Sequence, residues 1–126
     1  MERPIAHRGV VSVVAFAVTR TGAPGLEFFE ERSDRDKARL LKLFKLLGDR
    51  GWINNDQKFK PIEGTKFCEF KDFQLRMPCF RVGDTWVITH GFIKKKGPIP
   101  PTEIARAERI RGEDALMADA PARHKV

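Results

Sequence analysis

The residue types best suited to bind a phosphate group gather in one part of the chain. Lysine and arginine neutralise phosphates through charge-assisted hydrogen bonds, and polar neighbours help to fix the bound group. Between positions 66 and 96 these residues include Lys66, Glu69, Lys71, Gln74, Arg76, Lys94, Lys95 and Lys96. The pattern indicates a surface that suits a phosphodiester, provided that the fold brings these side chains together.

Three antiparallel strands are expected to carry this set, because apolar and polar side chains alternate through most of the region. Gly83-Asp84 is typical of a hairpin turn, and Asp72-Phe73 could form a second tight turn. The strands are expected over Thr65–Lys71, Gln74–Val82 and Thr85–Lys95. The first turn would then give two cross-strand pairs, Lys71 with Gln74 and Glu69 with Arg76.

Alternation also predicts one apolar and one polar face for this sheet. Helices would cover the apolar face, which consists of Cys68, Phe70, Leu75, Met77 and Cys79. To the polar face the third strand would add Val87, Thr89, Gly91 and Lys95. Small residues beside Arg76 would leave a shallow floor surrounded by cations. An ordinary solvated sheet with cross-strand charge pairs gives the same pattern, so both interpretations stay open.

Two further features allow a structural as well as a functional interpretation. The run Lys94-Lys95-Lys96 could protect the end of a strand or clamp phosphates. His90 shares its strand parity with Ile88 and Phe92, which favours a histidine in the core over a catalytic one.

The remaining elements predict an α+β fold in a single domain over residues 1–120. It would place an N-terminal strand and two helices on a curved antiparallel sheet, followed by a C-terminal helix. Ser33 or Asp34 can cap the second helix, and Gly48 is expected to end it. The expected elements are a strand over Gly9–Thr19, helices over Leu26–Glu31, Arg35–Leu47 and Pro101–Ala118, a loop over Gly51–Pro61 and a flexible tail over 121–126.

Composition narrows the class of protein. The chain has 126 residues and a net charge of +7, which favours a polyanionic partner without requiring one. Two cysteines are too few for a disulfide framework, and the three scattered histidines do not suggest a metal site, so we expect no metal. The apolar run Val10–Val18 resembles part of an export signal, but its nine residues fit a buried strand better. We expect a cytoplasmic protein that does not enter a membrane.

One segment resembles a known family. Val87–Glu108 reads Val-Ile-Thr-His-Gly-Phe-Ile-Lys-Lys-Lys-Gly-Pro-Ile-Pro-Pro-Thr-Glu-Ile-Ala-Arg-Ala-Glu. It is similar to the end of RelE/ParE-superfamily toxins, above all the phage-derived, HigB-like branch. There an apolar strand ends in His-Gly-Phe-x-Lys-Lys, and a Pro-x-x-Glu-Ile-x-x-Ala helix follows. Upstream, Phe67–Lys71 resembles the family's Glu-Leu-Arg strand, and Leu75-Arg76-Met77 stands where the family begins a Tyr-Arg-Val strand.

The resemblance implies the toxin of a type II toxin–antitoxin pair, with a RelE-like fold. Such toxins are metal-independent endoribonucleases (mRNA interferases) that cleave mRNA, commonly on the ribosome, and need no cofactor. The implied partners are a cognate antitoxin, expected to be a helix-turn-helix protein, together with mRNA and the ribosome. Carried over by position, Lys71 would bind or activate at the scissile phosphate, Arg76 would neutralise it, and Lys95 would stabilise the developing charge. Lys66, Gln74, Lys94 and Lys96 are the expected RNA-binding residues.

The chain departs from the family in having no tyrosine. Some relatives carry a catalytic tyrosine in the last helix, where Ile104 stands here. Proton transfer is therefore open among Glu69 as a base, Lys71 or Lys95 as acid or base, and His90 if it faces the groove. The alternative function is a non-catalytic binding protein. It would be either a ParE-like inhibitor of DNA gyrase or a relative that binds only RNA or its antitoxin.

Overall fold

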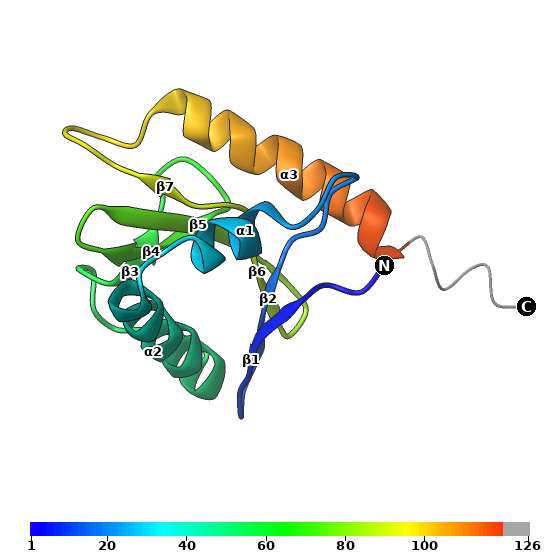
Figure 1. Ribbon diagram of the computed structural model, residues 1–126, viewed down its shortest axis with the longest axis horizontal. Coiled ribbons are helices and arrows are strands. Elements are labelled where there is room, and N and C mark those ends of the chain that lie inside the picture. Colours follow the sequence, from blue (N-terminus) through cyan, green and yellow to red (C-terminus); the bar gives the residue numbers. More distant parts are fainter. Residues whose placement is uncertain (120–126) are drawn as a thin grey trace, which may run out of the picture.

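The computed structural model describes residues 1–119, and the tail expected over 121–126 lies outside this range. The fold is α+β. A twisted, mixed sheet lies between α2 on one side and α3 on the other, while α1 packs against the sheet near its middle (Figure 1). The predicted fold class is thus confirmed in outline.

The strands in chain order are β1 (Ile5–Arg8), β2 (Val13–Phe16), β3 (Phe59–Pro61), β4 (Cys68–Asp72), β5 (Leu75–Val82), β6 (Thr85–Ile88) and β7 (Phe92–Ile93). Their order across the sheet is β1-β2-β6-β5-β4-β3, and β7 also pairs with β5. The pairs are antiparallel except β2 with β6, which run parallel. The prediction of a purely antiparallel sheet is therefore wrong.

The N-terminal strand differs from its prediction in extent and position. The single strand expected over Gly9–Thr19 is a hairpin, in which β1 leads into β2 through a turn at positions 9–12. Residues 14–18, at the end of β2 and just after it, are at most 2% exposed. A strand buried on both faces belongs in the middle of a sheet, and its apolar run lets β2 lie beside β6. The predicted loop over Gly51–Pro61 is also partly wrong, because its last three residues pair with β4 as β3.

The helices are α1 (Pro24–Glu30), α2 (Asp34–Arg50) and α3 (Pro101–Asp119). Ser33 caps α2 as predicted, because its Oγ accepts a hydrogen bond from the amide of Asp36 at 3.1 Å. The helix continues past Gly48 and ends at Gly51, whose φ of 79° is the left-handed cap conformation. The prediction that Gly48 ends the helix is wrong.

Gly48 instead allows the β1–β2 turn to approach α2. Its carbonyl accepts hydrogen bonds from the amides of Val11 and Ser12, at 3.0 and 2.8 Å. A Cβ on Gly9 would lie 2.0 Å from the carbonyl carbon of Gly48. The two glycines therefore permit a backbone contact that any side chain would block.

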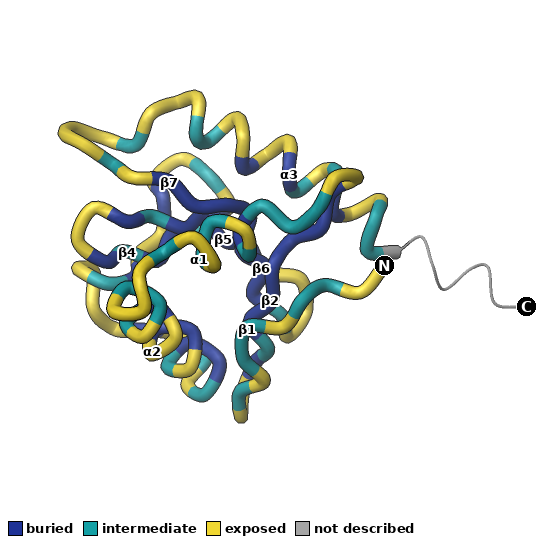
Figure 2. Tube along the Cα trace, viewed as in Figure 1, coloured by how far each residue is buried: buried dark blue, intermediate teal, exposed yellow. Residues whose placement is uncertain are grey.

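Two separate cores lie on the two faces of the sheet, and much of the central strands between them is buried (Figure 2). The larger core contains the predicted stripe Leu40, Leu43, Phe44 and Leu47 of α2, packed on the predicted apolar face of β4 and β5. The smaller core lies beneath α3 and contains Ala17, Ile62, Phe67, Phe80, Val87, Ala107 and Ile110. Both cysteines are free: Cys79 is buried and Cys68 half-buried.

We expect Gly9→Ala to destabilise the fold by about 1–3 kcal/mol, the usual cost of forcing an added methyl group into a packed site. Gly112→Ala is the matched control, because a Cβ there meets nothing within 4 Å and lies in the interior of α3. Alanine in that position should stabilise the helix by about 0.5–1 kcal/mol. Urea unfolding of the three proteins gives the comparison, and equal stabilities for Gly9→Ala and the wild type would contradict the close contact.

Candidate functional site

The β4–β5 hairpin brings Glu69, Lys71 and Arg76 to the same face of the sheet. Lys71 lies opposite Arg76, and the two-residue turn is Phe73-Gln74 rather than Asp72-Phe73. The predicted pairs are therefore wrong by two residues. Because side chains alternate with a period of two, this shift leaves Glu69, Lys71 and Arg76 on their predicted face, whereas Gln74 lies in the turn. The gathering of Glu69, Lys71 and Arg76 is thus confirmed, although the register is different.

Much of the expected polar floor is covered. Val87 and Thr89 are fully buried, with Val87 in the core beneath α3. Gly91 lies against α1, where an added Cβ would be 2.1 Å from the ring of Phe28. The floor predicted from the third strand is therefore wrong, because helices pack on both faces of this sheet. The part that remains open belongs to β3, β4 and β5.

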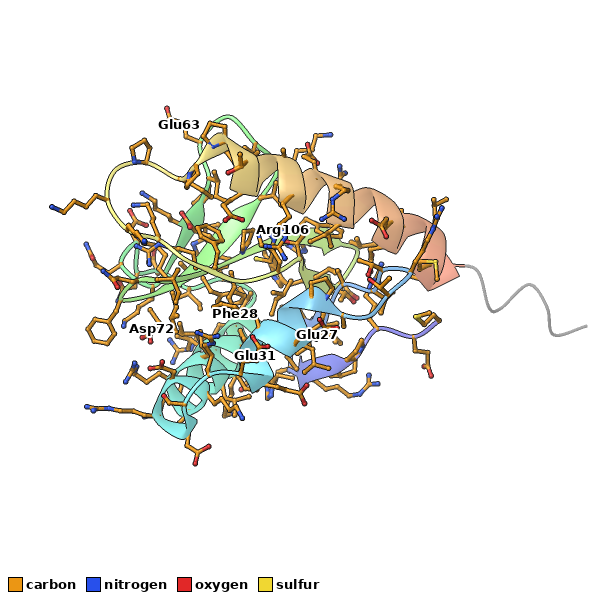
Figure 3. All side chains as sticks on the ribbon, turned by 45° about the horizontal axis from the view of Figure 1, so that its top comes forward. Glu27, Phe28, Glu31, Glu63, Asp72 and Arg106 are labelled. Carbon is orange, nitrogen blue, oxygen red and sulfur yellow. The ribbon has the colours of Figure 1, made fainter. Side chains whose placement is uncertain are left out.

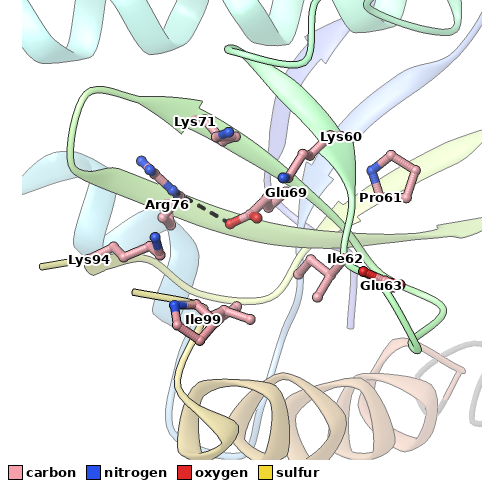
Figure 4. Close-up of a pocket in the computed structure, with 10 residues that line it drawn as sticks. Lys60, Pro61, Ile62, Glu63, Glu69, Lys71, Arg76, Lys94 and Ile99 are labelled. Carbon is pink, nitrogen blue, oxygen red and sulfur yellow. Dashed lines mark ion pairs between the residues drawn. The ribbon is translucent and has the colours of Figure 1, made fainter. Parts of the chain in front are cut away.

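A pocket of about 350 Å³ lies over this open part (Figure 4). Glu69, Lys71 and Arg76 contribute from the hairpin, and further lining residues come from β3, from the turn after it and from the connector before α3. These are Lys60, Pro61, Ile62, Glu63, Lys94, Pro98 and Ile99. Four cationic side chains and an apolar wall of prolines and isoleucines thus line one cavity. Such a lining matches a ligand that carries both a phosphate and an apolar ring.

The last long strand is interrupted, and this changes which lysine reaches the pocket. The sequence predicts one continuous strand over Thr85–Lys95, but β6 ends at Ile88 and β7 begins at Phe92. Phe92 pairs with Arg76, so the even-numbered residues of β7 and its extension share the face of Arg76. Lys94 accordingly lines the pocket, whereas Lys95 is exposed and lies outside the lining. The parity expected for Lys95 is therefore wrong.

The other predicted RNA-binding residues lie around the pocket rather than in it. Lys66, Gln74 and Lys96 are exposed in turns and in the connector, outside the lining. Sequence reasoning missed Lys60 and the apolar wall, because positions 59–61 were assigned to a loop. The alternation of buried Phe59 with exposed Lys60 was the available signal, but three residues are too few to define a strand by pattern alone.

Glu69 is the buried acid of the site. It is 6% exposed, and its Oε1 lies 3.7 Å from Nε of Arg76 without a hydrogen-bond partner within residues 1–119. Burial raises the pKa of Glu69 above its ordinary value of 4.5, while the positive charges of Arg76 and Lys71 oppose this shift. The pKa of Glu69 is therefore closer to neutrality than that of a free glutamate, and one of its carboxylate oxygens can still accept a proton.

Lys71 is shifted in the opposite direction. Burial lowers the pKa of Lys71 below its ordinary value of 10.5, and repulsion from Lys60 and Arg76 lowers it further. Its Nζ donates a hydrogen bond to the carbonyl of Asp56 at 3.1 Å. The ammonium group therefore gives up its proton more readily than that of a free lysine.

Hydrogen bonds to the backbone hold the guanidinium group of Arg76 in place. Its side chain is 12% exposed, and Nη1 donates hydrogen bonds to the carbonyl of Phe73 and, at 2.9 Å, to that of Leu75. The guanidinium group is therefore half-buried and bound to its own turn. This binding fixes the orientation of the cation before any ligand arrives.

His90 belongs to the core, as its parity favoured. It is 1% exposed, and its two ring nitrogens lie 2.9 Å from Thr89 Oγ1 and from Glu103 Oε1. Burial lowers the pKa of His90, and the positive charge of Arg106 contributes to this shift. Within residues 1–119, His90 is not part of the pocket lining. It connects the sheet to the first turn of α3.

Within residues 1–119, no group of three His, Cys, Asp or Glu side chains is arranged to hold a metal ion. None of the helices in that range has the length and apolar character needed to cross a membrane. A comparison with known protein families finds no match for this chain, and a comparison with curated protein sequences finds none either.

We expect Arg76→Gln to raise the pKa of Glu69 further, because it removes the largest of the positive charges that hold this pKa down. Arg81→Gln is the matched control: Arg81 lies on the same strand but is not among the charges that act on Glu69. A carbon-13 NMR titration of the glutamate carboxyl groups measures the shift. An unchanged Glu69 titration in Arg76→Gln would contradict the ion pair.

Proposed function

We propose that this protein is a cytoplasmic endoribonuclease that cleaves mRNA without a metal ion, as the toxin of a type II toxin–antitoxin pair. The observation that carries the proposal is the pocket itself. Four cations, Lys60, Lys71, Arg76 and Lys94, surround one buried carboxylate with a raised pKa. Lys60, Lys71 and Lys94 form no ion pair with a carboxylate within residues 1–119, so their charge is available to a ligand.

The reaction that fits these groups is attack by the RNA's own 2′-hydroxyl on the adjacent phosphorus. A base takes the proton from this hydroxyl, and an acid gives a proton to the departing 5′-oxygen. The products are a 2′,3′-cyclic phosphate and a free 5′-hydroxyl. We assign the base to Glu69 and the acid to Lys71, because their surroundings shift the two pKa values toward neutrality from opposite sides. Arg76 and Lys94 stabilise the charge on the phosphate oxygens.

The apolar wall supports RNA over an inorganic anion. Pro61 and Ile62 contribute to the lining on one side, and Pro98 and Ile99 on another. A nucleotide places an apolar ring beside its phosphate, and a simple polyanion does not. This combination favours a nucleic acid strand that enters with its base exposed, as in single-stranded RNA.

The RelE/ParE resemblance gives the proposal its biological context. Helices followed by a strongly twisted sheet and a last helix are compatible with a RelE-like, HigB-like fold, and the resemblance covers the residues around Arg76 and Lys94. The implied partners are the ribosome and a helix-turn-helix antitoxin. An antitoxin can silence such a toxin by covering the cationic pocket or by blocking ribosome entry from elsewhere, and we favour the second route.

We expect Arg76→Ala to slow cleavage by about two orders of magnitude or more, as the loss of one preorganised charge donor does elsewhere. Lys94→Ala should slow cleavage more than Lys95→Ala, because Lys94 lines the pocket and its neighbour lies outside it. Controlled expression followed by mapping of new mRNA 5′ ends measures the effect. The adjacent lysines form a matched pair, since each variant removes one positive charge from the same connector.

Arg76→Lys serves as a second variant, since it keeps the charge and should retain part of the activity if Arg76→Ala disturbs the turn. Cleavage of naked RNA by the purified protein should continue in EDTA, because side chains supply the cations. Full cleavage by Arg76→Ala and Lys94→Ala at equal expression would refute the site. Complete inhibition by EDTA on naked RNA would refute the metal-independent reaction.

The proton-transfer roles predict a bell-shaped dependence of the cleavage rate on pH. Activity requires ionised Glu69 and protonated Lys71, so the rate rises through the pKa of Glu69 and falls through that of Lys71. Because the first pKa is raised and the second lowered, the plateau should be narrower than free side chains would give. In Lys71→Arg the alkaline fall should disappear. Single-turnover rates across pH measure this, and an unchanged alkaline fall in Lys71→Arg would exclude Lys71 as the acid.

A further inference from the structure

The tip of the β4–β5 hairpin presents an aromatic ring to solvent. Phe73 is 75% exposed, more than any other phenylalanine or tryptophan within residues 1–119. Its φ of 53° lies in the left-handed region, where glycine or asparagine is usual in a tight turn. A bulky residue is therefore held in a position that neither burial nor turn geometry favours.

Two cations lie over this ring. The guanidinium carbon of Arg39 lies 5.0 Å from the ring centroid, and Nζ of Lys58 lies 5.4 Å from it. Both cations are anchored by Asp72, the residue before Phe73. Its carboxylate is 1% exposed and accepts a hydrogen bond from Nε of Arg39 at 2.9 Å and one from Nζ of Lys58 at 3.4 Å. Asp72 lies beside α2, at the edge of the molecule where the hairpin ends (Figure 3).

The same turn is connected to the pocket. Arg76 donates a hydrogen bond to the carbonyl of Phe73, and Arg76 lines the pocket together with Lys71 (Figure 4). The turn that carries the ring therefore lies next to Arg76, so an RNA strand that leaves the pocket past Arg76 can reach this turn. Asp72 offsets part of the charge of these two cations, and Lys58, whose side chain is 37% exposed, adds attraction for a neighbouring phosphate.

We infer that the solvent-exposed part of the Phe73 ring is a stacking platform for an unpaired RNA base near the cleaved phosphate, with Arg39 and Lys58 as the cations that lie over the ring. The inference rests on the proposed function and adds a base-binding position to it. Exposed aromatic rings among basic residues are the usual means by which proteins hold single-stranded nucleic acid. The face of every base can stack on the ring, so this platform contributes affinity and position more than sequence preference.

The test is the binding of a short single-stranded RNA, fully 2′-O-methylated so that it cannot be cleaved. Phe73→Ala should lower the affinity by about tenfold or more, the effect of losing one base–aromatic stack. Phe73→Trp should retain the affinity of the wild type. For an abasic strand of the same length, Phe73→Ala and the wild type should bind equally well, because this strand keeps its phosphates and lacks the bases.

Salt dependence separates stacking from charge. Phe73→Ala should leave the slope of log affinity against log salt unchanged, since it removes no phosphate contact, whereas Lys58→Ala should make the slope shallower. Phe73→Gly suits the left-handed turn and should lose affinity without a lower melting temperature, which excludes unfolding as the cause. Leu116→Ala is the matched control, an exposed apolar residue (69%) on α3.

Two outcomes would overturn the inference. If the wild type binds and cleaves RNA and Phe73→Ala binds it equally well, the platform is wrong while the proposed function stands. The exposed ring would then be better explained as a contact for a protein partner. If the wild type does not bind the strand at all, the proposed function fails and the platform fails with it.

Discussion

Gly91 has no side chain, and this allows the ring of Phe28 in α1 to lie against the backbone where β6 gives way to β7. The strand is interrupted at this point, so alternation begins again at β7 and Lys94 turns toward the pocket. Within the same interruption, His90 contacts Glu103 in the first turn of α3. One close approach between a helix and the sheet thus links three features: the break in the strand, the cation at the pocket's edge and the position where α3 begins.

Two opposing effects act on the pKa of Glu69, namely its burial and its attraction to the nearby cations. Glu69 is buried deeply enough that desolvation raises its pKa, although Arg76, Lys71, Lys60 and Lys94 all pull that pKa down. Among these cations, Arg76 alone comes within ion-pair distance, and it shares its guanidinium group with two backbone carbonyls. A buried acid with one incompletely paired oxygen is costly for folding, and such arrangements are concentrated at functional sites. The site therefore differs from the solvated sheet of charge pairs that equally explains the sequence pattern.

The parts of the fold that follow from local rules could be predicted from the sequence. The Leu40–Leu47 stripe, the Ser33 cap and the shared face of Glu69, Lys71 and Arg76 depend on short periodicities, which survive errors of register. What failed depends on contacts distant in sequence. The sequence alone predicts a helix end at Gly48, because it does not reveal that the β1–β2 turn packs against this glycine. It predicts Lys95 as the pocket cation, because it does not reveal the break between β6 and β7. Parallel pairing of β2 with β6 also joins segments about 70 residues apart, which no local pattern reveals.

Contacts with two helices fix the β4–β5 hairpin at its tip and further along its strands. At its tip, Asp72 binds Arg39 of α2 and so ties the turn to a helix that packs on the opposite face of the sheet. Further along, Phe80 on β5 lies in the core beneath α3. The pocket residues lie between these two anchors, on a pair of strands joined by a two-residue turn. A ligand that contacts both the turn and the pocket therefore meets groups whose spacing is set before binding, so that less conformational entropy is lost when it binds.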